Sequence, residues 1–215
     1  MGAIARNAAN NITTAGVFTS GAITNSSVTG ITVLANASDG ITLISSQTAS
    51  NSASLSFTSG LDSTYKAYKF VFVNIAPRTD AVKFTFNLST DAGSNYNVTK
   101  TSTFFAVEHT ESGASSALGY DSGQDLAQST AFQVLAYELG NGADESSSGS
   151  LQLFNPSSTT YVKHWISSIS GLQYTNVSYN WFTAGYGNTT SAVNAISFQM
   201  TSGNFDGTIY LYGIK

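Results

Sequence analysis

The feature that most constrains the fold is a series of short runs in which apolar and polar residues alternate. In the clearest one, residues 82–88 read Val-Lys-Phe-Thr-Phe-Asn-Leu. Successive side chains of a β-strand point to opposite faces of the sheet, so this run places its apolar side chains on one face and its polar ones on the other. It predicts a strand with one buried face.

Similar runs follow one another from residue 55 to the C-terminus. Clusters of turn-forming residues, such as 91–95 and 140–145, separate them. We expect strands at 55–57, 68–75, 82–88, 104–107, 132–139, 151–154, 161–169, 177–182, 193–200 and 208–214. This series predicts an all-β fold, an antiparallel β-sandwich of jelly-roll type. A helix is left open only at residues 124–131 and at the extreme N-terminus.

The composition of the chain changes near residue 50. Residues 1–50 contain one aromatic residue, Phe18, whereas the chain as a whole has 13 Phe, 11 Tyr and 2 Trp. Such ring surface is typical of a packed core and not of a disordered segment. We therefore predict an N-terminal attachment and oligomerisation arm over residues 1–50 and a jelly-roll-like β-sandwich domain over residues 51–215.

The arm contains a five-residue repeat with an apolar residue at its third position. Phe18, Ile23, Val28 and Val33 occupy that position, and we predict that they mediate oligomerisation and docking. Four pentads are too few to close a core, because repeats of this kind bury their apolar faces only when several units stack. The arm is therefore expected to become ordered only on copies of itself or on a partner. The alternative is a flexible tail in which the repetition arose by chance.

Charge is scarce, at 9% of the residues, and the net charge is −4. The eight Lys and Arg residues are spread along the chain and form no basic stripe for phosphates, so we expect no nucleic-acid partner. No run approaches the ~18 apolar residues of a membrane-spanning helix, so we expect no membrane insertion. With no Cys and only two distant histidines, His109 and His164, we expect no metal and no cofactor.

The sequence also lacks the marks of a catalytic site. No serine stands in a Gly-x-Ser-x-Gly context. Acidic residues stand close together at Glu108/Glu111, Asp121/Asp125 and Asp144/Glu145, in or beside loops rich in Ser and Gly. We expect solvated carboxylates there, because a general acid needs an apolar pocket that raises its pKa. We predict that the chain is not an enzyme.

Aromatic residues gather on two consecutive predicted strands. His164 shares a strand face with Val162 and Ile166, and we expect this face to point inward, with the imidazole hydrogen-bonded beneath the sheet. Flat rings with a polar edge can stack on sugars or form a subunit contact. A subunit contact or the core of a second sheet is favoured over a glycan platform. The candidate binding residues are Tyr161, Lys163, Trp165, Tyr179 and Trp181.

Three stretches of the second part carry a resemblance to a known family. They are residues 54–75 (SLSFTSGLDSTYKAYKFVFVNI), 84–96 (FTFNLSTDAGSNY) and 207–215 (GTIYLYGIK). Together they resemble β-sandwich domains of virion proteins from tailed bacteriophages, especially marine ones, over about residues 53–215. The run at 21–32 (GAITNSSVTGIT) is similar to the repetitive attachment segments of phage fibre proteins.

The resemblance implies a structural protein of the virion and no catalytic residues. It implies a trimeric appendage or decoration protein on the tail or head, often with the distal domain contacting the host surface. We therefore expect a homotrimeric tail-fibre or appendage subunit that docks on other virion proteins by its arm and displays its sandwich, with a host surface glycan as a further partner. Three alternatives stay open: a capsid (head) decoration protein, a carbohydrate-binding lectin-like module and a glycan-cleaving spike.

Overall fold

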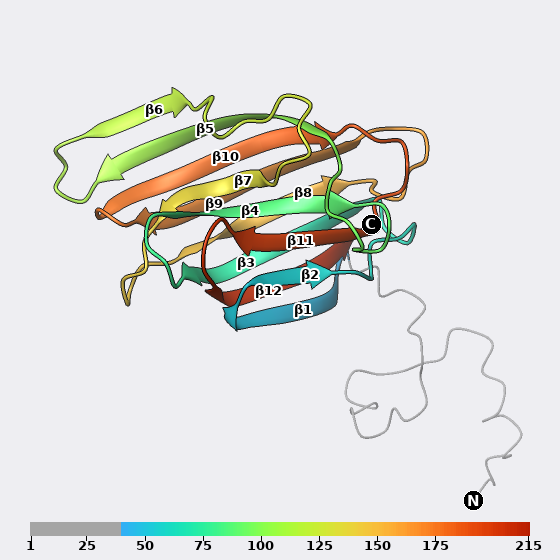
Figure 1. The fold of residues 1–215 in the computed structure, drawn as a ribbon, viewed down its shortest axis with the longest axis horizontal. Helices are drawn as coiled ribbons and strands as arrows, with labels where there is room; N and C mark the ends of the chain where they lie inside the picture. The colour runs from blue at the N-terminus through green and yellow to red at the C-terminus, as the bar shows by residue number, and fades with distance from the viewer. Residues whose placement is uncertain (1–39) are drawn as a thin grey trace, which may run out of the picture. The chain divides into compact units, whose positions relative to one another are not determined.

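The computed structural model describes residues 40–215, which form twelve antiparallel β-strands (Figure 1). Among these residues no helix is long and apolar enough to cross a membrane. The predicted all-β, antiparallel fold is confirmed. The strands are β1 (Ile41–Ser52), β2 (Ser54–Phe57), β3 (Ala67–Pro77), β4 (Val82–Ser89), β5 (Lys100–Thr110), β6 (Ser116–Tyr120), β7 (Gln133–Leu139), β8 (Ser147–Phe154), β9 (Lys163–Gln173), β10 (Val177–Gly187), β11 (Ala195–Met200) and β12 (Phe205–Ile214).

Eight of the strands follow the plan of a jelly roll. The orders β1-β12-β3-β8 and β2-β11-β4-β7 form two facing layers (Figure 1). Taken in chain order, these eight strands alternate between the layers at every connection except the one from β4 to β7, which lie side by side in the same layer. The outermost strands, β1 and β2, also approach each other, since Gln47 Nε2 donates a hydrogen bond to the Ser56 carbonyl at 2.8 Å. The sandwich is therefore nearly closed along this side.

Two inserted strand pairs enlarge one layer. β9 pairs with β8 and with β10, β10 pairs with β5 over its whole length, and β5 pairs with β6. The larger sheet thus runs β1-β12-β3-β8-β9-β10-β5-β6, with β6 as a free edge at the top of Figure 1. β9 also pairs with β7 at one position, Gln173 with Leu139, which joins the two layers into one continuous sheet. We call β9, β10, β5 and β6 the extension.

The core is centred on Phe198 of β11. Its ring is fully buried, and the centroids of five neighbouring rings lie 5.2 to 6.4 Å from it. Most of these pairs are edge-to-face or tilted, which is the geometry that the ring quadrupoles favour. The five rings come from three alternating runs of the sequence and are Phe57, Phe70, Phe72, Phe84 and Phe86.

The predicted boundary at residue 50 is wrong, because residues 41–50 belong to β1 and pair with β12. The sequence of β1 is rich in Ser and Thr and buries only Ala49 fully, so it lacks the apolar alternation that identifies a strand. The predicted docking positions Phe18, Ile23, Val28 and Val33 lie outside the described residues.

The helix left open at residues 124–131 is not formed. The segment runs beside β5 instead, and Lys100 and Ser129 exchange two backbone hydrogen bonds of 2.8 and 3.0 Å. The amide and carbonyl of Ser129 therefore pair across chain segments and are not available to a helical turn.

Candidate functional site

Four of the five aromatic and basic residues predicted as a binding group point into the sandwich. Lys163, Trp165, Tyr179 and Trp181 are buried, and only Tyr161, at 68% exposed, is open to solvent. The rings of Tyr179 and Trp181 stack with centroids 5.2 Å apart. These four residues build the core beneath the extension, which is the alternative favoured over a glycan platform.

The predicted facing of β9 is inverted. His164 and Ile166 point outward, and Lys163 and Trp165 point inward. The inward indole of Trp165 is almost fully buried and packs edge-to-face on Phe86, with ring centroids 5.3 Å apart. Lys163 tolerates the buried position because its Nζ donates to the carbonyls of Tyr161 at 2.6 Å and Thr189 at 3.2 Å.

The outward side of the extension carries large apolar side chains that nothing in the described residues covers. Phe105 lies opposite Phe182 on the neighbouring strand, and their rings stack with centroids 4.8 Å apart and an angle of 12°. Val107 lies opposite Leu118, which is 71% exposed. We call this surface the outer apolar face, and it consists of Phe105, Val107, Leu118, Ile166 and Phe182.

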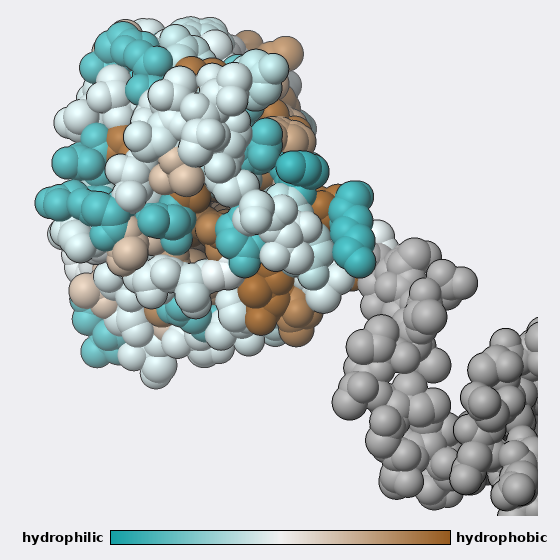
Figure 2. Space-filling model, turned by 90° about the vertical axis from the view of Figure 1, so that its right-hand side faces the viewer, coloured by the Kyte–Doolittle hydropathy of each residue, from teal (hydrophilic) through white to brown (hydrophobic). Residues whose placement is uncertain are grey.

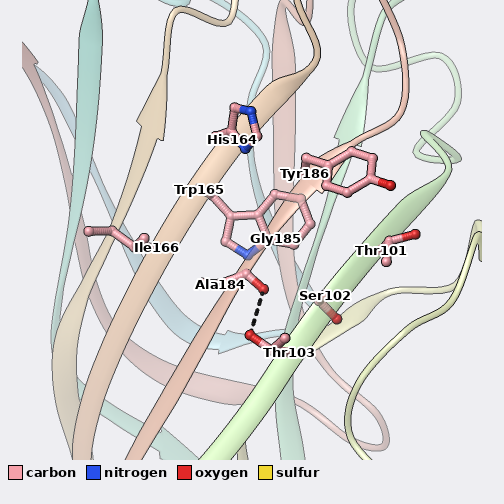
Figure 3. A pocket seen from close by; sticks show the side chains of 9 residues that line it. All are labelled: Thr101, Ser102, Thr103, His164, Trp165, Ile166, Ala184, Gly185 and Tyr186. Carbon is pink, nitrogen blue, oxygen red and sulfur yellow. Dashed lines mark hydrogen bonds between the residues drawn. The ribbon is translucent and has the colours of Figure 1, made fainter.

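Two hollows adjoin the outer apolar face. The first, of about 360 Å³, crosses β5, β10 and β9, and Figure 3 shows His164, Tyr186 and Thr101 around it. The hollow exists because Ala184 and Gly185 are small, whereas His164, Ile166 and Tyr186 around them are large. A second hollow of about 340 Å³ lies over β3, β8, β9 and β10, and Ile166 lines both.

Gly185 is required where the first hollow meets the core. A Cβ atom at this position would lie 2.6 Å from Cζ2 of Trp165 and 2.5 Å from the carbonyl oxygen of Thr101. Both distances are far below van der Waals contact, and one of the two atoms belongs to the backbone. The buried indole therefore depends on a glycine in the neighbouring strand.

No formal charge lies on the outward positions of the extension. Apart from two histidines, His109 and His164, the outward positions of β5, β6, β9 and β10 carry only apolar, hydroxyl, amide and phenol side chains. Figure 2 shows another side of the molecule, the right-hand end of Figure 1, where hydrophilic groups in teal lie among pale and brown areas. An uncharged apolar surface such as that of the extension is typical of a contact with another macromolecule.

The free edge of β6 adjoins this face. Its sequence, Ser-Ala-Leu-Gly-Tyr, contains no charge and no proline, and every residue is exposed. Natural proteins protect such edges with charges, prolines or a covering segment, because unpaired N–H and C=O groups accept a further strand. Within residues 40–215, β6 has none of these protections and can pair with a strand of a partner.

Members of two of the local acid pairs named above are engaged in hydrogen bonds within their own loops. No group of three or more His, Cys, Asp or Glu side chains among residues 40–215 is arranged to hold a metal ion. Of the local acid pairs, the two carboxylates Asp121 and Asp125 bond to the Gly123 amide and the Tyr120 hydroxyl, respectively. Glu145 accepts from the Gly142 amide at 2.6 Å and closes its own turn.

The alternation of apolar and polar residues does not predict the outer apolar face, although the sequence contains one signal of it. Residues 104–107 read Phe-Phe-Ala-Val, and Phe182 follows Trp181 directly. Apolar residues at consecutive strand positions need cover on both faces of the sheet. Comparison with known proteins adds no relative, because no protein-family model, curated protein or solved structure matches the chain.

Proposed function

We propose that the chain is a structural subunit of a tailed-bacteriophage virion, a tail-fibre or appendage protein that acts by assembly and not by catalysis. The observation that carries the proposal is the uncharged outer apolar face beside the free edge of β6. In a lone chain this surface stays in water, at a cost of about 25 cal/mol for each Å² of apolar area. The jelly-roll connectivity adds support by analogy, since capsid and lectin domains use it.

A second copy of the chain is the partner that best fits this face. The chain carries a net charge of −4, so copies repel each other over most of their surfaces. The outward positions of the extension carry no formal charge, and two such faces can meet without like-charge repulsion. The edge of β6 can add antiparallel hydrogen bonds to the same contact. In this proposal the homotrimer forms through the extension, and residues before β1 dock on other proteins of the tail or head.

Sedimentation of the full chain tests this assembly. We expect the wild type to sediment as an oligomer, and Leu118→Asp to shift it to monomers, because the substitution places a charge in the centre of the contact. Tyr161→Asp adds the same charge at an exposed residue outside the outer apolar face and should leave the oligomer intact. A wild type that stays monomeric at high concentration, or an oligomer unaffected by Leu118→Asp, would contradict the proposal.

Two truncations separate docking from folding. Removing residues 1–38 leaves all twelve strands, so we expect an unchanged melting temperature and a loss of incorporation into particles. Removing residues 1–52 also removes β1 and exposes the edge of β12, which should destabilise the domain by well over the ~1 kcal/mol of a typical substitution. Thermal unfolding and particle incorporation give the two readouts. Normal incorporation of the shorter truncation would overturn the docking role.

A carbohydrate-binding module is the second candidate, and the first hollow favours it. Tyr186 and His164 offer rings with centroids 6.0 Å apart, and Thr101 offers a hydroxyl (Figure 3). Binding of host polysaccharide that is lost in Tyr186→Ala would support this function, whereas equal binding by the variant would exclude this hollow.

A further inference from the structure

A pocket of about 230 Å³ lies on the inward side of the β5–β6 hairpin, away from the outer apolar face. The backbone register explains its shape. Ala117, Glu108 and Tyr179 form one row across β6, β5 and β10, and Gly119 and Ala106 stand in the next row. Three of the inward positions carry Ala or Gly where a sandwich usually packs large apolar residues, so the space beneath the hairpin stays open.

Tyrosine rings form the walls of this pocket. Tyr137 of β7 lies across from Tyr179, with ring centroids 5.6 Å apart at 64°, and Trp181 supports Tyr179 from behind by stacking. Burial raises the pKa of both phenols, and the negative charge of Asp121 raises that of Tyr137 further. Both rings therefore stay neutral up to alkaline pH and present π-electron density to whatever occupies the pocket.

Two carboxylates line the same pocket without a basic partner. Glu108 accepts a hydrogen bond from the Tyr179 hydroxyl, and Asp121 is fixed at the end of β6, where its backbone N–H donates to the Phe104 carbonyl at 3.0 Å. No Lys, Arg or His lines the pocket. Lys83 on β4 donates to Gln124 Oε1 at 2.8 Å and is not part of the lining. The pocket thus combines aromatic walls with uncompensated negative charge.

We propose that this pocket binds a small organic cation, an alkylammonium group such as a free amine or the side chain of a lysine on a partner protein. Tyrosine rings attract ammonium groups through their quadrupole, and carboxylates add Coulomb attraction that is strengthened by partial burial. A neutral ligand of the same size would lack both terms. The pocket and the assembly contact share β6 but use opposite faces of the hairpin, so Leu118→Asp tests assembly and Glu108→Gln tests cation binding, and either proposal can fail without the other.

Titration of the full chain with tetramethylammonium, n-butylammonium and an Nα-acetyl-lysine ester tests the proposal, with n-butanol as the neutral probe. Chemical shifts of the residues lining the pocket report on binding. We expect saturable binding of the cations, weakened by salt, and none of n-butanol. Preference for the lysine ester over the free amines would indicate a partner protein, and the reverse would indicate a free amine.

Matched variants make the result specific. Glu108→Gln keeps an acceptor for the Tyr179 hydroxyl but removes the charge, and should weaken cation binding about tenfold or more. Glu111→Gln removes the same charge from the exposed turn of the same hairpin and should leave binding unchanged. Equal binding of n-butanol, no cation binding at all, or equal losses in the two variants would each overturn the proposal.

Discussion

Replacing Phe198 by alanine is expected to lower the free energy of unfolding by about 3–5 kcal/mol. The side chain is fully buried, and five phenylalanine rings from β2, β3 and β4 surround it. Truncation removes the ring from all of these contacts and leaves a cavity that rigid strands on both sides cannot close. The substitution therefore weakens the packing between strands of both layers.

Equilibrium unfolding in urea measures this loss. The midpoint should fall while the slope stays close to that of the wild type, because the surface exposed on unfolding hardly changes. Tyr161→Ala removes a ring of similar size from an exposed position and should change the stability by no more than ~0.5 kcal/mol. A loss below ~1 kcal/mol for Phe198→Ala would show that the core repacks around the cavity.

The strands that the sequence predicts correctly are those with one apolar face. Residues 82–88 alternate strictly, and β4 covers them, but the prediction of one buried face is wrong, since Thr85 and Asn87 on the polar face are buried as well. β1 and β6 were not predicted, because β1 is rich in small polar residues and every residue of β6 is exposed. The alternation reports burial and not strand formation, so strands held mainly by backbone pairing with a neighbour leave no such mark.

The candidate surface was harder to predict than the fold. The outer apolar face depends on β5 pairing with β10, two strands separated by more than sixty residues, and no local pattern specifies that pairing. Trp165 and Trp181 are both buried on the inner side of the extension, where Trp165 packs on Phe86 and Trp181 on Tyr179. The direction of Trp165 could not be predicted, because alternation gives two faces without saying which one is covered, and here Trp165 and Lys163 point inward.

A second large effect is expected from pH: the stability should rise between about pH 7 and pH 10. Lys100 is fully buried, and its Nζ donates to Oδ1 of Asn87 at 2.5 Å and to the Val98 carbonyl at 2.7 Å, with no carboxylate partner. Burial lowers the pKa of Lys100 to about 7. An unfolded chain keeps its lysines near 10.4 and so binds a proton that the folded chain has released.

The sign and size of the effect follow from this difference. Between the two pKa values each pH unit adds about 1.4 kcal/mol, so the full window is worth up to about 5 kcal/mol. The stability is lost as the pH falls toward 7 and changes little below it. Burial also lowers the pKa of Lys163, which adds a contribution of the same sign. The raised pKa values of Tyr137 and Tyr179 act in the opposite direction, but only above about pH 10.

Urea unfolding at pH 7, 8 and 9 separates Lys100 from these other groups. Lys100→Met keeps most of the apolar stem and has no amine to titrate, so its stability should depend much less on pH than that of the wild type, with only the Lys163 contribution remaining. Lys66→Met removes an exposed lysine and should keep the wild-type slope. If the wild type gained no stability over this range, or if Lys100→Met kept the full slope, Lys100 would have to stay charged inside the sandwich. The two oxygens that it contacts would then be enough to hold an ammonium group in the core without a counter-ion.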